Sequence, residues 1–387
     1  MRTIRDIPQF ENIPILVRVA MNVPLEQGRV VNDYRLRRAI PTIQYLSERG
    51  ARVVLLSHIG EEGTETLAPV YEALKKLIPR VSFFPETIGP RAREAVRSLL
   101  PGHILVLENL RRDTREQLND ETFARELAAL GDVFVEDSFD TCHRRHASIV
   151  GIPKFLPSYA GLLVEEEVRE LQKALRPESP SLAVIGGAKF STKEAVLTTL
   201  LKTYDHVFVG GALANDFLKA AGHQVGKSLV SDQDTDSIQR LLGNPQLALP
   251  IDALVVPGDV VGTPNEQTSA RVASVDAIHP DESIRDQGPG TDALLASLAA
   301  QAKSILWNGP LGKYESGFVG ATDAFAAATA RSAAHSVVGG GDTVASIETL
   351  GLLSKFSFVS TGGGAMLDFL AKGTLPGIEA LDAHPIA

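Results

Sequence analysis

The sequence predicts an α/β protein built on mainly parallel β-sheets. Short β-branched and aliphatic runs alternate with longer segments of helical periodicity along the whole chain. Strand, helix, strand in this order is typical of parallel sheets with right-handed crossover connections. A chain of 387 residues is also long for one domain and comfortable for two.

The predicted strands are short β-branched or aliphatic runs. In chain order they cover 13–20, 51–58, 81–84, 103–109, 132–139, 181–187, 206–211, 251–257, 303–309, 335–341 and 356–364. Segments with helical periodicity lie between many of them, for example 35–50 and 291–303. We find no repeat of fixed period and no low-complexity tract.

The character of the strand ends changes near residue 160, which indicates a domain boundary. Before it the strand ends carry Arg, His and Asn, and after residue 180 they carry glycine clusters. Between them, 161–178 has the pattern of a charged amphipathic helix that ends in a Pro/Ser turn. We interpret it as an interdomain helix between an N-terminal domain, 1–160, and a C-terminal domain, 179–367. A crossover helix inside one large domain is the alternative.

Composition narrows the functional classes. The formal net charge of −9 argues against broad nucleic-acid binding. Cys142 is the single cysteine, so an internal disulfide framework is excluded and a reducing cytosol is favoured. The start, MRTIRDIPQF, lacks the apolar segment of a secretory signal, and no apolar run is long enough to span a membrane. We expect a cytoplasmic protein with no membrane partner.

The second half carries glycine-rich turns after its strands. They lie at 186–193, 209–217, 307–315, 338–343 and 360–365. Glycine lets the backbone approach a ligand closely, and a glycine cluster that leads into a helix directs free N–H groups at an anion. One such turn is more often only a tight turn, but several in one domain favour a phosphate-bearing ligand.

Two standard nucleotide motifs are excluded. The segment 222–228, GHQVGKS, has three residues between its glycines where the P-loop has four, and it follows a helical pattern instead of a strand. Gly222 is better explained as the residue that ends that helix. No G-x-G-x-x-G follows a strand, so a dinucleotide-binding dehydrogenase is not expected.

Polar residues around the glycine turns point to phosphoryl transfer. Lys189 and Lys193 are four residues apart and would share one face if the segment is helical. Two cations directed at one place suit a phosphoryl group whose charge is spread over three oxygens. Asp342, among glycines at a helix start, is either a Mg²⁺-positioning carboxylate or a plain N-cap.

In the first half, cationic and amide side chains follow separate strands, and one, Arg35, opens the helical segment 35–50. They are Asn22, Arg35, His58, Arg111 and Arg144. Each alone is most simply a solvated surface residue or a cap. Together they suggest a cationic basin for an anionic substrate, because the planar guanidinium fork matches carboxylate and phosphate oxygens.

At this point the motifs resemble a known family, the phosphoglycerate kinases. The resemblance runs from near residue 13 to about 380 and rests on ordered blocks with the spacing of that family. The blocks are VRVAMNVP, NDYRLRRAIPTI, LSHIG, LENLR, VEDSFDTCHRRHAS, GGAKFSTK, WNGPLGKYE, VGGGDTVA and STGGGAMLDFLAKGTLPGIEAL.

The resemblance implies two doubly wound domains that close by hinge bending, in a monomer. The N-terminal domain would bind 3-phosphoglycerate and the C-terminal domain MgATP or MgADP, with Mg²⁺ as cofactor. The segment 368–387 would return to pack on the N-terminal domain. The family transfers a phosphoryl group between ATP and a carboxylate, and closure would align the reactants and exclude water.

Site residues carry over from the family motifs position by position. The resemblance implies catalytic roles for Arg35, Lys189, Lys193, Gly341 and Gly364. It implies nucleotide contacts from Lys193, Gly210, Gly211, Ala212, Asn308, Pro310, Glu315, Gly340, Gly341, Asp342 and Thr343, with Asp342 near the metal. It implies acceptor contacts from Asn22, Arg35, His58, Arg111 and Arg144, with Glu61, Arg112 and Arg145 as further candidates.

The acceptor half departs from the family pattern. Where the family has Asp-Phe, this chain has Ala20 and Met21, so an oxygen that would accept a hydrogen bond from the substrate hydroxyl is missing. Glu61 stands where the family has a phosphate-binding arginine. Arg112 and Arg145 are additional cations that either restore the basin's charge and pair with Glu61 or point to solvent. In the nucleotide half, Lys313 replaces an apolar residue near the base.

Three functions remain open from the sequence. The first is a phosphoglycerate kinase with an unusual acceptor site. The second is a carboxylate kinase of the same fold that acts on a related acid, one that lacks the hydroxyl or carries an amine near Glu61. The third is a nucleotide-binding scaffold without catalysis, against which the presence of Arg35, Lys189, Lys193 and Asp342 argues.

Overall fold

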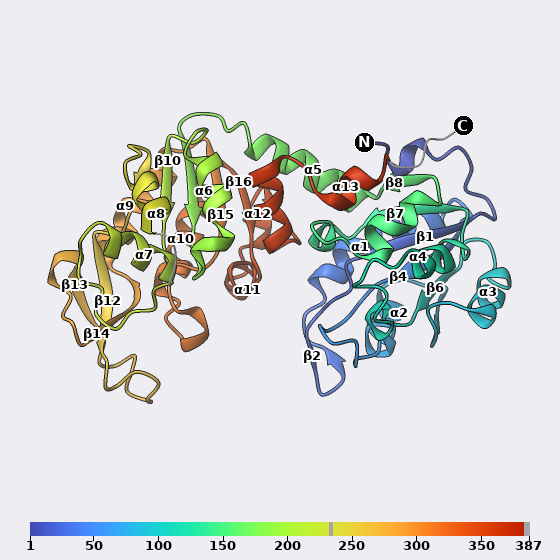
Figure 1. Ribbon diagram of the computed structural model, residues 1–387, viewed down its shortest axis with the longest axis horizontal. Helices are drawn as coiled ribbons and strands as arrows, with labels where there is room; N and C mark the ends of the chain where they lie inside the picture. Colours follow the sequence, from blue (N-terminus) through green and yellow to red (C-terminus); the bar gives the residue numbers. More distant parts are fainter. Residues whose placement is uncertain (232–234, 383–387) are drawn as a thin grey trace. The chain divides into compact units, whose positions relative to one another are not determined.

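The chain folds into two compact units, each built around its own parallel sheet. The computed structural model describes residues 1–231 and 235–382 (Figure 1). Unit 1 comprises Met1–Arg169 and the described residues from Thr374 onward, and unit 2 comprises the described residues of Glu170–Gly373. Each unit contains a six-stranded sheet flanked by helices, which confirms the α/β prediction.

The sheet of unit 1 is wholly parallel. Its strands, in spatial order, are β5 (Val81–Phe84), β6 (Ile104–Leu107), β4 (Arg52–Leu56), β1 (Pro14–Val19), β7 (Val133–Asp137) and β8 (Ser158–Ala160). All six residues of β1 are buried, as expected of a central parallel strand covered on both faces. The chain runs outward from β1 in both directions, so the crevice beyond the carboxyl end of β1 is the natural place for a ligand.

Alternate residues of the strands build two cores on opposite faces of this sheet. The helices of unit 1 are α1 (Tyr34–Ser47), α2 (Ala68–Leu77), α3 (Pro90–Arg97), α4 (Glu121–Ala128) and α13 (Pro376–Ala380). On one face, Val17 packs with the buried side chains of α1 and α2, and on the other, Leu16 packs with those of α3 and α4. Successive residues of β1 point to opposite faces of the sheet, so this one strand contributes side chains to both cores.

The final helix of the described chain belongs to unit 1. Gly377 N in α13 donates to Cys142 O at 2.8 Å. Gly377 has to be glycine here, because a Cβ would lie 3.0 Å from Cys142 Cα and 2.9 Å from a methyl carbon of Ile149. The helix α5 (Leu162–Ala174) carries the chain from unit 1 into unit 2.

The main sheet of unit 2 is also wholly parallel. Its strands, in spatial order, are β11 (Leu247–Ala248), β10 (His206–Val209), β9 (Ser181–Ile185), β15 (Ser304–Asn308), β16 (His335–Gly339) and β17 (Phe358–Val359). Trp307 of β15 is fully buried and meets the ring of Phe325 edge to face. The strand order reverses between β9 and β15, which marks their carboxyl ends as the expected ligand site.

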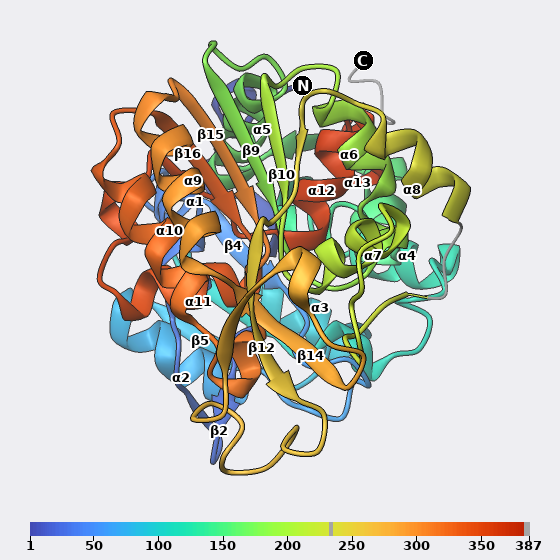
Figure 2. The same ribbon diagram turned by 90° about the vertical axis from the view of Figure 1, so that its left-hand side faces the viewer.

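Helices cover both faces of this sheet, as Figure 2 shows. They are α6 (Glu194–Leu200), α7 (Ala212–Ala220), α8 (Thr235–Leu242), α9 (Pro289–Gln301), α10 (Gly320–Arg331), α11 (Gly341–Thr349) and α12 (Gly363–Lys372). The helix α6 contacts α12, and α10 contacts both α9 and α11. None of the described helices is long and apolar enough to cross a membrane.

A smaller sheet in unit 2 differs from the sequence prediction. The predicted strand 251–257 forms as β12 (Asp252–Pro257), but it pairs antiparallel with β13 (Arg271–Ser274) and β14 (Glu282–Gln287) instead of joining the parallel sheet. The sequences RVAS and ESIRDQ of β13 and β14 contain few apolar residues, so neither was predicted as a strand. Unit 1 also holds a short hairpin, β2 (Leu25–Glu26) and β3 (Arg29–Val30).

Candidate functional site

A pocket of about 680 Å³ opens at the carboxyl ends of β9, β10, β15 and β16 in unit 2. The polar and glycine residues that follow these strands line it, together with the first turns of α7, α11 and α12. Of the residues expected at a nucleotide site, the lining includes Lys193, Gly211, Ala212, Asn308, Pro310, Glu315, Gly340, Gly341, Asp342 and Gly364. Their convergence makes this pocket the candidate nucleotide site.

Glycine is required where the strand-end turns meet. Gly211 has φ +64°, and a Cβ there would lie 2.8 Å from both Gly187 N and Pro310 O. Gly309 has φ +96°, and its Cβ would lie 2.5 Å from Gly186 O. The three turns therefore pack backbone against backbone, which leaves no room for side chains at Gly211 and Gly309.

Two helices begin at this pocket without side-chain caps. The helix α11 starts after Gly340, which has φ +105°, and α12 starts after Gly362, and neither N-cap residue makes a side-chain cap hydrogen bond. The first N–H groups of a helix have no partner within it, and they carry the positive end of the helix dipole. Both starts are therefore suited to phosphate oxygens.

Lys193 supplies a positive charge inside the pocket. Its side chain is almost fully buried, and burial lowers its pKa. The Nζ atom lies close to the backbone of Gly187, where an added Cβ would meet it at 2.9 Å. A desolvated ammonium at this depth is placed to meet a charged group that fills the pocket.

The other end of the pocket has apolar walls and buried charges. Leu218, Leu229, Pro250, Ala253, Ile284 and Leu311 line it. Arg285 also lines the pocket and forms a buried ion pair with Glu266, with Nε and Oε1 2.5 Å apart. Asp286 also lines the pocket, and burial raises its pKa to about 7. The apolar walls suit the flat faces of a nucleobase.

Asp342 is the residue that fits a magnesium ion. It lies in the first turn of α11, its side chain is exposed, and Gly340 holds the N-cap position. The alternative that Asp342 is an N-cap is therefore wrong. Among the described residues no cluster of three His, Cys, Asp or Glu side chains could hold a metal by itself. This suits Mg²⁺, which binds through one or two carboxylates, nucleotide phosphates and water.

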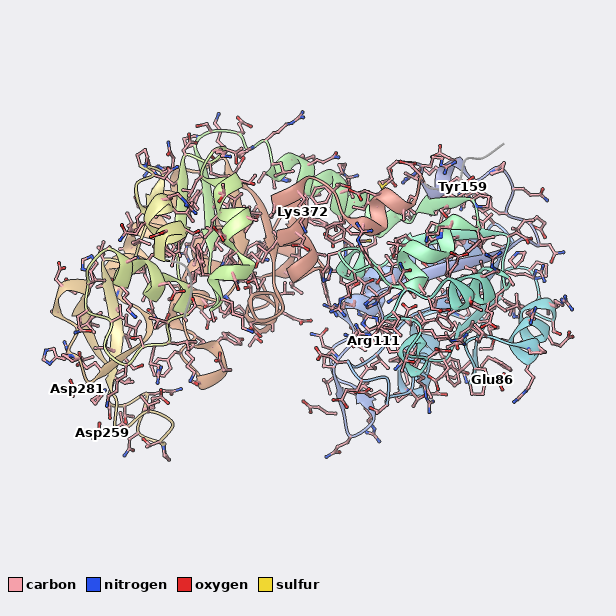
Figure 3. The ribbon with its side chains drawn as sticks, viewed as in Figure 1. Glu86, Arg111, Tyr159, Asp259, Asp281 and Lys372 are labelled. Carbon is pink, nitrogen blue, oxygen red and sulfur yellow. The ribbon has the colours of Figure 1, made fainter. Side chains whose placement is uncertain are left out.

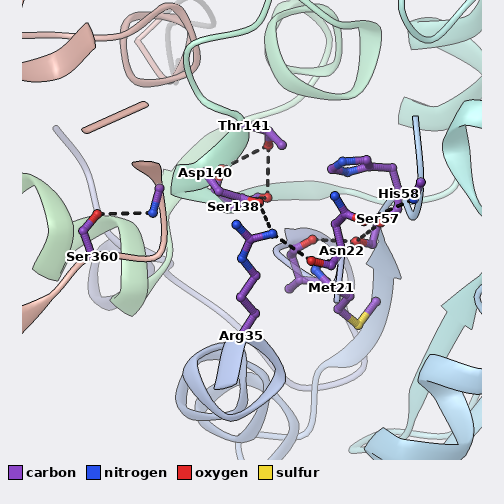
Figure 4. Close-up of polar contacts among 12 residues, drawn as sticks. Met21, Asn22, Arg35, Ser57, His58, Ser138, Asp140, Thr141 and Ser360 are labelled. Carbon is purple, nitrogen blue, oxygen red and sulfur yellow. Dashed lines mark hydrogen bonds and ion pairs between the residues drawn. The ribbon is translucent and has the colours of Figure 1, made fainter. Parts of the chain in front are cut away.

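In unit 1, polar side chains gather beyond the carboxyl ends of β1, β4 and β7 (Figure 4). We call Asn22, Arg35, His58, Arg111 and Arg144 the acceptor basin. Arg35 Nη1 donates to Asn22 O at 2.7 Å, and Asn22 Oδ1 accepts from Gly60 N at 3.1 Å. Arg35 comes from α1 and Asn22 from the turn after β1, so the contact joins two elements at the ligand end of the sheet.

His58 is a buried, neutral member of the basin. Arg18 Nη2 donates to its Nδ1 at 2.9 Å, so the proton of the neutral ring lies on Nε2. Burial lowers the pKa of His58 well below its usual range, and the charges of Arg18, Arg111 and Arg144 lower it further. His58 therefore offers an N–H donor to an anion without carrying a charge itself.

Arg111 and Arg144 supply the positive charge near His58. Arg111, labelled in Figure 3, is largely buried, and its Nη1 donates to Gly60 O at 2.5 Å. Its Nε is buried and has no hydrogen-bond partner among residues 1–231 and 235–382. Burial and the nearby charge of Arg144 lower the pKa of Arg111. The positive charges of these two guanidinium groups repel each other, and a bound anion would relieve that repulsion.

Glu61 brings a negative charge to the same place. Its side chain is exposed, and its backbone carbonyl accepts from Gln117 Nε2 at 3.1 Å. Its carboxylate raises the pKa of Arg111, against the larger effect of burial. Glu61 therefore lies near enough to Arg111 to offset part of the basin's positive charge.

Comparison with known proteins decides the family. The family model "Phosphoglycerate kinase" matches residues 4–373. This chain belongs to the phosphoglycerate kinase family. A phosphoglycerate kinase from Roseiflexus castenholzii is 44% identical over 393 residues, with 98% of this chain and 99% of the relative covered. One from Thermomicrobium roseum is 42% identical over 394 residues with the same coverage.

Solved structures of phosphoglycerate kinases share the fold. The enzyme from Coxiella burnetii is 39% identical and superposes with a TM-score of 0.84, over 98% of both chains. The enzyme from Pyrococcus horikoshii is 30% identical with a TM-score of 0.86, over 99% of both chains. The chain is thus a phosphoglycerate kinase-type phosphotransferase, a kinase whose acceptor is a carboxyl group.

The two lysines expected to act in this family do not share a helical face. Phe190–Thr192 is a single 3₁₀ turn and α6 begins only at Glu194, so the helical premise was wrong. Lys193 lines the pocket, whereas Lys189 is exposed and is not among the lining residues. Gly210 and Thr343 lie behind the lining, where Thr343 Oγ1 accepts from Gly309 N at 3.1 Å.

The additional arginines do not pair with Glu61. Arg112 forms an ion pair with Glu108, with Nη1 and Oε2 3.0 Å apart. Arg145 is exposed and makes no ion pair with any residue of 1–231 or 235–382. Arg112 therefore does not neutralise Glu61, and that alternative is wrong for this residue. For Arg145, no contact among the described residues supports it.

Two residues that contact the acceptor basin, Arg18 and Asp140, were not predicted from the sequence. Arg18 lies inside an otherwise apolar strand, a signal that could have revealed it, because a charge in a central strand needs a buried partner. Asp140 pairs with Arg35, with Oδ2 and Nη1 3.6 Å apart. No spacing rule identifies Asp140, since the contact joins the turn after β7 to α1.

Proposed function

We propose that this protein transfers the γ-phosphoryl group of MgATP to the carboxylate of 3-phosphoglycerate, and the reverse. The observation that carries the proposal is the pocket in unit 2, where Lys193, Asp342 and the uncapped starts of α11 and α12 converge. Those groups match the triphosphate of a nucleotide. The acceptor basin of unit 1 matches a small anion with two charged ends.

Each group has a role that follows from its chemistry. A carboxylate is already ionised at neutral pH, so its oxygen attacks the γ-phosphorus without a general base. The new P–O bond forms as the bond from that phosphorus to the β,γ-bridging oxygen breaks, and ADP leaves. Lys193 and the N–H groups at Gly341 and Gly364 stabilise the charge on the transferring group. Bound Mg²⁺, held through the phosphates and Asp342, would neutralise further phosphate charge.

In the basin, Arg35 meets the reacting carboxylate, while His58, Arg111 and Arg144 bind the substrate phosphate. Asn22 lies near the hydroxyl. His58 contributes one N–H donor, and the two arginines contribute charge. Lys189 is exposed, and its proposed role is to accompany the transferring phosphoryl group when both ligands are bound.

A second candidate is a related carboxylic acid with less negative charge than 3-phosphoglycerate. Glu61 near Arg111 and the loss of an acceptor atom at Ala20 favour it. A zwitterionic acid with an amine near Glu61 would suit this basin. Such an acceptor would use the same nucleotide site and the same Arg35.

ATP turnover against a panel of carboxylic acids tests the proposal. The panel includes 3-phosphoglycerate and amino acids, and hydroxylamine traps the acyl phosphate product. We expect 3-phosphoglycerate to give the fastest turnover at low concentration. Faster turnover with a zwitterionic acid would favour the second candidate. ATP binding with no turnover on any acid would contradict both and indicate a scaffold.

A further inference from the structure

Asp140, a carboxylate beside the acceptor basin, already forms an ion pair with Arg35. Asp140 Oδ2 lies 3.6 Å from Arg35 Nη1, the guanidinium proposed to meet the reacting carboxylate (Figure 4). The side chain of Asp140 is only 7% exposed, whereas that of Arg35 is 32% exposed. An internal carboxylate therefore occupies a position beside Arg35 that an incoming carboxylate would otherwise take.

Hydrogen bonds hold Asp140 in this orientation. Ser138 Oγ donates to Asp140 Oδ1 at 2.7 Å. Ser138 is in turn contacted by Thr141 Oγ1 at 3.0 Å and by Arg18 Nη1 at 3.4 Å. These contacts fix the carboxylate at the rim of the basin and direct its second oxygen toward Arg35.

An acceptor carboxylate at Arg35 would therefore meet a second negative charge. A single guanidinium carries one positive charge, so it cannot neutralise two carboxylates at once. Repulsion between carboxylates at a partly desolvated site is stronger than in water. The acceptor must either displace Asp140 from Arg35 or bind beside it at a cost in affinity.

We propose that Asp140 is a specificity-determining residue that competes with the acceptor's carboxylate for Arg35. The inference rests on the proposed function, because it assigns Arg35 to the carboxylate end of the acceptor. Asp140 weakens the binding of acceptors through their carboxylate and leaves the binding of their phosphate end unchanged. The charge of the reacting carboxylate falls as its oxygen bonds to phosphorus, so the competition is strongest before the transfer.

Direct binding of two probes to Asp140→Asn tests the inference. The probes are 3-phosphoglycerate and glycerol 3-phosphate, which has the phosphate but lacks the carboxylate. Asparagine keeps the Ser138 hydrogen bond and removes only the charge. Calorimetry should show 3-phosphoglycerate binding about two- to fivefold more tightly to the variant, the effect of one ion pair with a partly exposed cation. The affinity for glycerol 3-phosphate should not change.

Two further variants separate Asp140 from general charge effects. Glu62→Gln removes an equal charge from the exposed loop after β4, and we expect it to change neither affinity. In an Arg35→Met background, Asp140→Asn should no longer tighten 3-phosphoglycerate, because the contested cation is gone. Ser138→Ala should give a smaller gain than Asp140→Asn, since it only loosens the carboxylate.

The outcomes distinguish this inference from the proposed function. Equal gains for both probes, or a gain that persists without Arg35, would overturn the role of Asp140. Turnover of 3-phosphoglycerate with no affinity change in Asp140→Asn would overturn it while leaving the proposed function intact. A tightened affinity without turnover would support it and contradict the proposed function. No binding of 3-phosphoglycerate to either protein would overturn both.

Discussion

Two cations of the acceptor basin, Arg35 and Arg111, already have acceptors within the chain. Arg35 is engaged by Asn22 O and by Asp140. Arg111 is engaged by Gly60 O and is influenced by the charge of Glu61. A substrate anion therefore competes with internal acceptors at two of its contacts. The affinity for the substrate therefore depends on Asp140 and Glu61 as much as on the arginines of the basin.

Glu61→Arg should strengthen the binding of a phosphate-bearing acceptor. The side chain is exposed, so the change costs little stability, and it replaces a repulsive charge near Arg111 with an attractive one. We expect the KM for 3-phosphoglycerate to fall about tenfold, the equivalent of about 1.4 kcal/mol, with Tm unchanged.

Glu62→Arg is the matched control for this change. It introduces the same charge one residue further along the exposed loop, and we expect a much smaller effect on KM. Restoring an aspartate at Ala20 is a poorer test, because Ala20 is fully buried and a carboxylate there would lose its hydration. An unchanged or higher KM in Glu61→Arg would contradict our account of the acceptor site.

His58 makes stability depend on pH in a defined direction. Its pKa in the folded chain lies well below 6.5, so below pH 6.5 the unfolded state takes up a proton that the folded state does not. Stability is therefore lost as pH falls below about 6.5, by at most about 1.4 kcal/mol per pH unit for one group. His58→Gln should reduce this slope, measured by urea unfolding at pH 5, 6 and 7.

His146 offers a comparison for this slope. Burial and the charge of Arg144 lower its pKa to about 4. His146 therefore also reduces folding stability as the pH falls below about 6.5, and it should still do so in His58→Gln. A slope in His58→Gln equal to that of the parent protein would show that His58 titrates normally. Because His58 stays neutral, we expect the affinity for the acceptor not to rise as the pH falls from 8 to 6.5.

The sequence was enough to identify the polar strand ends, but not their pairing. Asn22, His58 and Arg111 were predicted because each follows a strand, and parallel strands deliver their ends to one edge. The contact of Asp140 with Arg35 depends on how the turn after β7 lies against α1, and local sequence does not encode that placement. For the same reason Arg112 was considered as a partner for Glu61, although it pairs with Glu108 one helical turn away.

At the scale of elements, the nucleotide pocket is made by helix starts and glycine turns. The helices α11 and α12 begin at its edge without side-chain caps. The glycines fall in two classes. Gly340 is held at φ +105°, where a side chain would be strained, whereas a Cβ on Gly341 would meet no atom within 4 Å. The fold therefore does not require glycine at position 341.

Gly341→Ala should separate binding from folding. Alanine at the first turn of a helix costs no strain here and is the better helix former, so Tm should stay the same or rise slightly. The added methyl group stands between the N–H groups of α11 and any phosphate that approaches them. We expect the affinity for MgATP, measured by calorimetry, to fall at least about tenfold.

Gly351→Ala provides the control for backbone effects alone. Gly351 has φ +68° at the end of α11, and its Cβ would also meet nothing within 4 Å. There we expect Tm to fall through backbone strain while the MgATP affinity is kept. Normal MgATP affinity in Gly341→Ala would show that phosphates do not approach the start of α11.

At the scale of the whole molecule, the sequence predicted the class of fold better than its details. Most parallel strands of the two main sheets were recognisable because their runs are apolar, whereas the short edge strands β8 and β11 were not predicted. The antiparallel partners of β12 were not, because β13 is largely exposed and β14 is made mostly of polar and charged residues, among them the buried Arg285. Those segments form strands because they pair with β12, and their local β-propensity does not predict that pairing.

The division into two units predicts that each ligand protects its own unit. A ligand that binds only the folded state stabilises the unit that holds its site, by about 2.7 kcal/mol at 100 times its Kd. Hydrogen exchange with MgATP should show protection at the starts of α7, α11 and α12 in unit 2. With 3-phosphoglycerate, protection should appear at the turns after β1, β4 and β7 in unit 1. Gly341→Ala should lose the first pattern and keep the second. Protection of unit 2 by 3-phosphoglycerate alone would place the acceptor in the wrong unit and contradict the assignment of both sites.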